Sequence, residues 1–122
     1  MRIERLSASE IEPYIGEALD RETGELSDVM QEIERGVSEA WRITEGDALA
    51  CMVTRIEGAE LVVVALQGRG LRELAPRVIE QAERVGCRSV RYHTQHGRIS
   101  EILSEFGFIE AERVYRVRLN GR

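Results

Sequence analysis

The segment Gln67-Gly68-Arg69-Gly70 has the clearest chemical potential in the sequence, because it joins an apolar run to a helical pattern. The run Leu61–Leu66 precedes it, and helical spacing begins at Leu71. Free N–H groups and the dipole at a helix N-terminus attract anions, and glycine lets the backbone approach a ligand closely. We therefore predict a loop that offers amides to an anion, with Arg69 and Arg72 pairing with phosphates. A tight turn that binds no ligand is the alternative.

Two histidines are the candidates for proton transfer. His93 and His96 both fall at the end of a strand expected over 89–94. Histidine titrates near neutral pH, so either side chain is a candidate base. The alternatives are a packed strand residue for His93 and a loop or N-cap residue for His96. We expect no metal site, because no carboxylate or thiol ligand accompanies this pair in the sequence.

Carboxylates and one tyrosine complete the candidates. Glu57 and Glu60 flank a hairpin turn, either as bases or as residues that solvate the turn. Tyr115 lies on the expected last strand, either as a proton donor or as an edge-strand aromatic residue. Three further carboxylates lie in the helical region, and they either attract a cationic amine or only solvate a helix face. They are Glu22, Glu25 and Asp28.

Composition sets limits on the class of protein. The 122 residues are 43% hydrophobic and 32% charged, which is typical of one globular domain over 1–122. The net charge of −5 argues against a nucleic-acid partner. The longest apolar run has six residues, far below the roughly 20 that a membrane helix needs, and the N-terminus lacks a signal-peptide core. We therefore expect a cytoplasmic protein with no membrane partner, whose Cys51 and Cys87 stay reduced.

The expected elements form a mixed sheet that is covered by helices on both faces. Hairpin turns at 45–47 and 57–58 predict antiparallel neighbours, and the segment from Leu61 to Thr94 requires a right-handed parallel crossover. Leu61–Leu66 is apolar throughout, which indicates a central strand buried on both faces. Trp41 is expected to anchor the core or a subunit interface. The expected strands cover 1–6, 41–44, 48–56, 61–66, 89–94 and 113–119, and the expected helices cover 9–21, 26–36, 71–85 and 99–106.

This α/β order, β-α-α-β-β-β-α-β-α-β, resembles the GNAT superfamily of acetyl-CoA-dependent N-acetyltransferases. Three local features carry the likeness over nearly the whole chain. Leu61–Leu66 leads into a Gly/Arg loop, the helix ending at Gly86 is followed at once by a strand, and the helix over 102–106 ends in Gly107-Phe108. The sequence also resembles short phage- and prophage-encoded members of this superfamily.

The resemblance implies a cofactor, a reaction and a set of contacts. Acetyl-CoA would lay its pantetheine arm in a gap between the fourth and fifth strands and its pyrophosphate on the loop that follows. A primary amine, on a small molecule or on a protein, would then attack the thioester directly. The residues that the resemblance assigns to the cofactor are Val64, Ala65, Leu66, Gln67, Gly68, Arg69, Gly70, Leu71 and Arg72.

Departures from the family pattern in three places, namely the loop, the helix of the general acid and the tail, leave a second function open. The loop is shorter than in the family, Leu103 stands where many members carry a proton-donating tyrosine, and His96 stands where an asparagine is common. The chain after Phe108 is also too short for the usual two C-terminal strands, so a partner chain, including a second copy in a homodimer, is expected to cover that edge. The alternative function is a non-catalytic binding or assembly protein of this fold, encoded by a phage, that has lost cofactor use.

Overall fold

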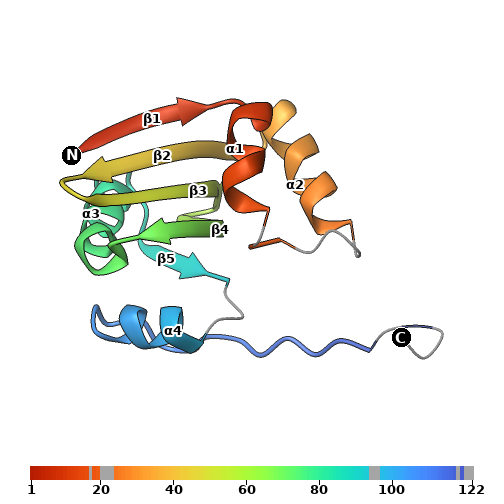
Figure 1. The fold of residues 1–122 in the computed structure, drawn as a ribbon. Helices are drawn as coiled ribbons and strands as arrows, with labels where there is room; N and C mark the ends of the chain where they lie inside the picture. Colours follow the sequence, from red (N-terminus) through yellow and green to blue (C-terminus); the bar gives the residue numbers. More distant parts are fainter. Residues whose placement is uncertain (17, 20–23, 94–96, 118, 120–122) are drawn as a thin grey trace.

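Two hairpins and one crossover build the sheet, as the turn residues predict. The computed structural model describes residues 1–16, 18–19, 24–93, 97–117 and 119 (Figure 1). The strands lie side by side in chain order: β1 (Arg2–Leu6), β2 (Glu39–Glu45), β3 (Ala48–Glu57), β4 (Glu60–Arg69) and β5 (Ser89–Tyr92). The helices are α1 (Ala8–Ile15), α2 (Glu25–Glu34), α3 (Leu71–Arg84) and α4 (Gly97–Ser104).

The sheet is mixed, which confirms the predicted α/β fold class. Strands β1 to β4 pair antiparallel with their neighbours, whereas β4 and β5 run parallel and are joined through α3. A parallel pair needs a crossover of this kind, because a short turn only reverses the chain. Strand β4 is therefore flanked by an antiparallel and a parallel neighbour.

Helices cover both faces of the sheet, and each face has its own apolar core. Helices α1 and α2 pack on one face, where Ile11, Ile15 and Val53 are buried. Helix α3 packs on the other face, where Met52 and Val78 are buried. Strand β4 contributes to both cores, so the prediction that it is central and doubly covered is confirmed.

Helix α1 begins with the predicted capping box but is shorter than the predicted 9–21. The Glu10 amide donates to Ser7 Oγ at 3.3 Å, and the Ser7 amide donates to Glu10 Oε1 at 2.9 Å. The helix ends at Ile15, yet Leu19 is buried in the same core. The helical spacing of Leu19 thus reflects its burial rather than a longer helix.

Two further predictions about elements are wrong. Strand β4 continues to Arg69, so 67–69 belong to the strand and not to the predicted loop. The cause is β3, which runs far enough to pair Leu49 with Arg69. The strand predicted over 113–119 is not formed by the described residues of that segment, because its alternating side chains have no neighbouring strand in this chain. None of the described helices is long and apolar enough to cross a membrane.

Arginine–glutamate pairs stabilise the sheet edge near β5. Arg91 pairs with Glu57 at 2.8 Å and with Glu60 at 3.0 Å, and Arg55 also pairs with Glu57 at 2.8 Å. The hydrogen bond from Arg91, together with that from Arg55, lowers the pKa of Glu57 below its ordinary value of 4.5. A carboxylate with a lowered pKa stabilises the fold above its ordinary pKa, and this contribution is lost as the pH falls through the lowered value.

We predict that the Glu57→Gln variant loses less thermal stability on acidification than the natural protein does. The natural protein should unfold at progressively lower temperature as the pH falls below 4.5, because Glu57 must then be protonated. Thermal unfolding followed by circular dichroism across this range measures the slope. Glu12→Gln is the matched control, since Glu12 is exposed and no ion pair joins it to another described residue. Equal slopes for the two variants would contradict the account.

Candidate functional site

A β-bulge in β4 lies next to the point where the described pairing between β4 and β5 ends. Val53 of β3 pairs with Ala65 and Thr54 pairs with Val63, so Val64 is an extra residue without an opposite partner. A bulge bends its strand and increases the local twist. Pairing between β4 and β5 stops at Val63 and Tyr92, which is the position next to the bulge. The bulge at Val64 thus lies directly beside the end of this pairing, and the predicted gap between the fourth and fifth strands stays a prediction.

Beyond the bulge, the described residues leave one edge of β4 and the start of α3 without backbone partners. Val64 to Arg69 have no partner among the described residues of β5, and Ala65 to Arg69 pair on their other edge with β3. At the start of α3 the Glu73 and Leu74 amides both donate to the Gly70 carbonyl. Among the described residues no side chain caps this helix, and the amides of Leu71 and Arg72 have no backbone acceptor. The first amides of a helix lack intrahelical acceptors in this way, and their predicted role in attracting an anion stays a prediction.

The two glycines of this segment serve close packing against β3. A Cβ on Gly68 would overlap the Leu49 carbonyl oxygen and lie 2.6 Å from Ala50 Cα. A Cβ on Gly70, whose φ is +73°, would lie 2.5 Å from Ala48 Cβ. The glycines are thus required because the neighbouring strand approaches closely. The sequence alone instead suggests that they make room for a pyrophosphate.

The polar side chains of the segment already have protein neighbours. Arg69 Nε donates to the Asp47 carbonyl oxygen at 3.0 Å, and Arg72 pairs with Glu105 at 2.8 Å. The Arg72–Glu105 pair is well exposed, so it contributes little to stability and can be exchanged for another anion. Gln67 lies opposite Cys51 on the α1–α2 face, and its Oε1 is buried with no partner among the described residues.

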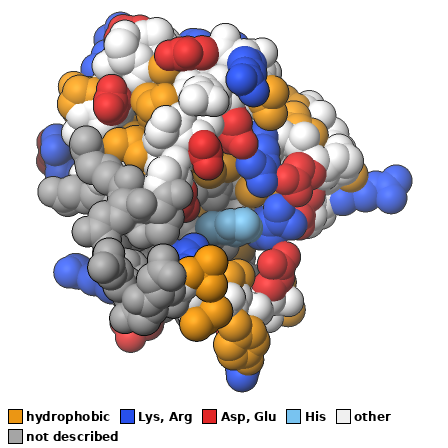
Figure 2. All heavy atoms as spheres, turned by 90° about the vertical axis from the view of Figure 1, so that its right-hand side faces the viewer, with side chains coloured by type: hydrophobic (Ala, Val, Ile, Leu, Met, Phe, Trp, Pro, Cys, Tyr) orange, Lys and Arg blue, Asp and Glu red, His pale blue; other side chains and the backbone are white. Residues whose placement is uncertain are grey.

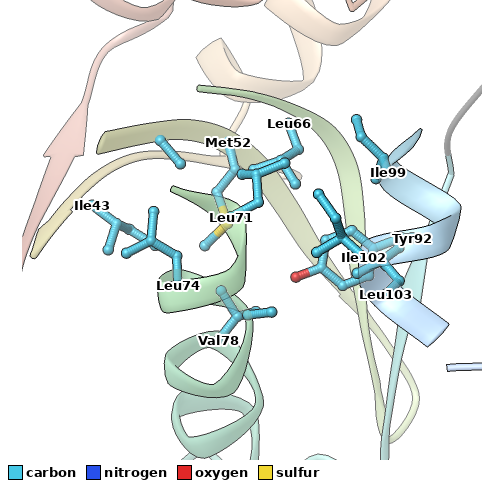
Figure 3. Close-up of a pocket in the computed structure, with 12 residues that line it drawn as sticks. Ile43, Met52, Leu66, Leu71, Leu74, Val78, Tyr92, Ile99, Ile102 and Leu103 are labelled. Atoms are coloured by element: carbon cyan, nitrogen blue, oxygen red, sulfur yellow. The ribbon is translucent and has the colours of Figure 1, made fainter. Parts of the chain in front are cut away.

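An apolar pocket lies between the sheet, α3 and α4, on the side where β4 and β5 separate (Figure 3). Its walls include Leu66, the last apolar residue of β4, and Leu71, the first residue of α3. Helix α4 closes it with Ile99, Ile102 and Leu103. The remaining volume is about 20 Å³, close to that of a single water molecule. The lining side chains, including those of α4, therefore leave only a small cavity beside Leu66 and Leu71.

Tyr92 belongs to this pocket, and the sequence analysis did not single it out as a site residue. In Figure 3 its hydroxyl group points into the pocket towards Val78. Its ring contacts the Phe108 ring edge-on, with the centroids 5.1 Å apart. Burial raises the pKa of Tyr92 well above its ordinary value, so its proton is held at neutral pH. The only signal in the sequence is its alternation with Val90 on one strand face.

His93 lies where the two strands separate. It directly follows β5, its amide bonds to the Val63 carbonyl at 3.4 Å, and its side chain is exposed. Because Tyr92 faces the α3–α4 side, alternation along the strand places His93 on the side of α1 and α2. Figure 2 shows acidic and basic side chains around a histidine side chain, which it draws in pale blue. His96 lies outside the described residues.

The other predicted side chains are not gathered at His93. Glu57 and Glu60 are held by Arg91, and Glu25 and Asp28 lie in the first turn of α2, where a helix dipole favours carboxylates. Glu22 lies outside the described residues. Tyr115 is exposed on the C-terminal segment, and no hydrogen bond or ring contact joins it to the described part of the site. Its role as an acid stays a prediction.

Within the described part of the chain, no group of three or more histidine, cysteine or acidic side chains is placed to hold a metal ion. Trp41 has a structural contact, because its Nε1 donates to Thr54 Oγ1 at 3.0 Å beside the α3-side core. A buried or half-buried indole N–H needs such an acceptor.

The fold is that of GNAT acetyltransferases over nearly the full chain. The structure is similar to a ribosomal-protein-alanine N-acetyltransferase from Brucella melitensis biovar Abortus 2308, with a TM-score of 0.59, 14% identity, and coverage of 98% of this chain and 100% of the other. It is also similar to the aminoglycoside N-acetyltransferase AAC(6')-Iy in complex with CoA, with a TM-score of 0.52, 16% identity, and coverage of 96% and 98%.

A third similar structure has a different description. It is a transcriptional regulator from Bacillus halodurans C-125, with a TM-score of 0.62, 12% identity, and coverage of 97% of this chain and 99% of the other. No family model and no curated protein matches the sequence. At these identities the likeness shows the fold, and the activity has to be argued from the site.

We predict that Gly68→Ala strongly destabilises the fold, by about 1–3 kcal/mol or more, because the new methyl group meets the β3 backbone. Gly97→Ala is the matched control, since nothing lies within 4 Å of a Cβ there. The control should be neutral or stabilising by up to about 1 kcal/mol. Urea denaturation measures both values. A Gly68→Ala variant as stable as the control would show that this glycine is not there for strand packing.

Proposed function

We propose that this protein is a GNAT-type N-acetyltransferase that transfers the acetyl group of acetyl-CoA to an amine. The supporting observation is that the described pairing of β4 with β5 ends beside the Val64 bulge, together with the Leu71 and Arg72 amides, which have no backbone acceptor among the described residues. The unpaired edge of β4 offers hydrogen bonds of the kind that an extended amide-containing arm would use. The start of α3 offers N–H groups and a positive dipole end to a pyrophosphate.

The residues at the phosphate end fit the cofactor. Arg72 is exposed beside the free amides, and Arg69 lies just before them on β4. Guanidinium groups pair well with phosphate oxygens, and exchange of the exposed Glu105 partner for a phosphate costs little. Bound there, acetyl-CoA would supply an activated acetyl thioester.

The pantetheine arm of acetyl-CoA would fit beside β4 only after a movement of α4. Because Ile99, Ile102 and Leu103 fill the space beside Leu66, the proposed activity requires this helix to shift away from the sheet. Helix α4 is two turns long and contacts the body mainly through such apolar side chains, so its displacement exposes a limited apolar area. Binding would have to compensate for that exposure.

His93 is the proposed base. In the reaction the amine nitrogen attacks the acetyl carbonyl carbon, the carbon–sulfur bond breaks, and the sulfur leaves as a thiolate that takes up a proton. His93 would accept the proton that the ammonium group must lose before it attacks. Tyr115 remains the proposed proton donor to the thiolate, and reaches the site only if the C-terminal segment changes its course. His96 stays a second candidate base.

The acceptor is proposed only as a class, a primary amine on a small molecule or on a protein. The similar structures include enzymes named for an aminoglycoside and for a ribosomal-protein alanine. The carboxylates of α2 on the same side as His93 favour a cationic acceptor. A reaction that uses acetyl-CoA also fits the cytoplasmic location expected from the sequence.

A non-catalytic protein of this fold is the second candidate, and the closed pocket favours it. A volume of about 20 Å³ leaves no room for the arm, and Leu103 brings no proton donor to α4. In that case the fold would serve binding or assembly. That a phage encodes the protein stays a prediction. Cofactor binding separates the two candidates.

We predict that CoA raises the unfolding temperature of the protein and that Arg72→Glu weakens CoA binding about tenfold, through the loss of a charge-assisted contact. Isothermal titration calorimetry and thermal shift measure both effects. Arg84→Glu is the matched control, because it makes the same charge change on α3 roughly 18 Å further along the helix axis at 1.5 Å per residue. Absence of any shift at saturating CoA would favour the non-catalytic candidate.

We predict that His93→Asn lowers kcat about 100-fold or more while CoA affinity stays unchanged, because a base acts on the amine and not on the cofactor. The measurement is thiol release from acetyl-CoA with a panel of amines, alongside a CoA titration of the same variant. An unchanged kcat would remove His93 from the mechanism and leave His96 to be tested.

A further inference from the structure

The C-terminal segment carries an apolar face that no other described part of the chain covers. Its side chains are exposed although they are large and apolar, and Figure 1 shows the segment running beyond β5 and away from the sheet. Soluble proteins seldom leave several such side chains together in water. The apolar side chains that are at least 80% exposed are Ile109, Val114, Tyr115, Val117 and Leu119.

The segment has the pattern of a strand but no strand to pair with. Odd-numbered positions from Ile109 to Leu119 are mostly apolar, and the even-numbered positions Glu110, Glu112 and Arg116 are charged. This period of two is typical of a half-buried strand. The described residues of the segment nevertheless form no strand, because Phe108 is fixed against Tyr92 at the end of β5 and the chain then continues past the sheet.

The sequence of this segment is complementary to itself when it is reversed. If two copies run antiparallel with Val114 opposite Val114, acidic positions meet basic ones and most apolar positions meet apolar ones, whereas Arg113 lies opposite Tyr115. Opposite charges and apolar residues in directly opposed positions stabilise antiparallel pairs. The opposed positions are Ile109 with Leu119, Ala111 with Val117, Glu112 with Arg116, and Arg113 with Tyr115.

We propose that residues 109–119, the tail, pair antiparallel with the tail of a second copy of this chain about a two-fold axis at Val114. An isologous contact of this kind is self-complementary, as a two-fold dimer requires. The pairing gives the backbone N–H and C=O groups of both tails partners and brings their apolar faces together. The existing contacts of the tail are weak, since Glu110–Arg113 at 3.4 Å and Arg91–Glu112 at 3.7 Å are surface pairs.

Two cysteine variants test the proposed register. Val114→Cys places the two thiols opposite each other at the axis, where Cα atoms of an antiparallel pair lie about 4.5–5.5 Å apart, within the range of a disulfide. Val117→Cys is the matched control, because its two copies would lie roughly 20 Å apart at 3.3 Å per residue. Native Cys51 is buried and Cys87 half-buried, so the natural protein under the same oxidant gives the background.

The expected result is a disulfide-linked dimer on a non-reducing gel for Val114→Cys, and none above background for Val117→Cys. Light scattering of the natural protein over a concentration series should show a mass that approaches twice 13.8 kDa. A mass of 13.8 kDa at every concentration would overturn the proposal. Equal cross-linking of both variants would also overturn it, and so would a dimer in which Val114→Cys does not cross-link. In either case the tails would pair in another register or with another edge.

Charge reversal gives an independent test of the same pairing. Glu112→Arg and Arg116→Glu should each shift the protein to the monomer, because like charges become opposed in both halves of the dimer. The double variant should restore the dimer, because it exchanges the two charges of each pair. The Glu112–Arg91 contact within one chain is not repaired by Arg116→Glu, so restoration by the double variant can come only from the contact between tails. Failure of the double variant to restore the dimer would contradict the proposal.

Discussion

The Val64 bulge is the local feature on which the site depends. The described pairing of β4 with β5 ends at Val63 and Tyr92, directly before this extra residue. A bulge bends its strand, and the residues from Ala65 to Arg69 pair with β3 alone among the described residues. The end of β4 lies close against β3, which explains the two glycines, and α3 begins immediately after it. The proposed site is thus built from one strand end and the helix N-terminus that follows it.

Much of the fold follows from the sequence, because turns and burial patterns are local signals. The hairpin turns, the crossover, the doubly buried β4 and the Ser7–Glu10 capping box are all as predicted. The bulge could not be predicted, since Leu61–Leu66 is apolar at every position and gives no alternation in which an extra residue would stand out. The loop over 67–69 was predicted wrongly for the same kind of reason, because its pairing with β3 depends on how far the opposite strand runs.

The site is less predictable than the fold because its state depends on packing between distant segments. The spacing of Ile99, Ile102 and Leu103 predicts a helix, but only the structure places their side chains beside Leu66 and Leu71. Likewise, alternation in the tail predicts a strand, but a strand needs a partner that this chain does not provide. For α4 the spacing predicts the element correctly, whereas the strand predicted in the tail is not formed by the described residues. In both cases neighbouring segments decide the outcome, which the sequence pattern alone does not show.

Amide hydrogen exchange measured by NMR, with and without CoA, tests most directly whether the free groups beyond Val64 form a cofactor site. The account predicts fast exchange at the Leu71 and Arg72 amides in the free protein and slow exchange when CoA is bound, because the pyrophosphate would accept their hydrogen bonds. It also predicts changed exchange in α4, which must move for the arm to enter. Unchanged exchange at Leu71, Arg72 and α4 at saturating CoA would contradict the central claim.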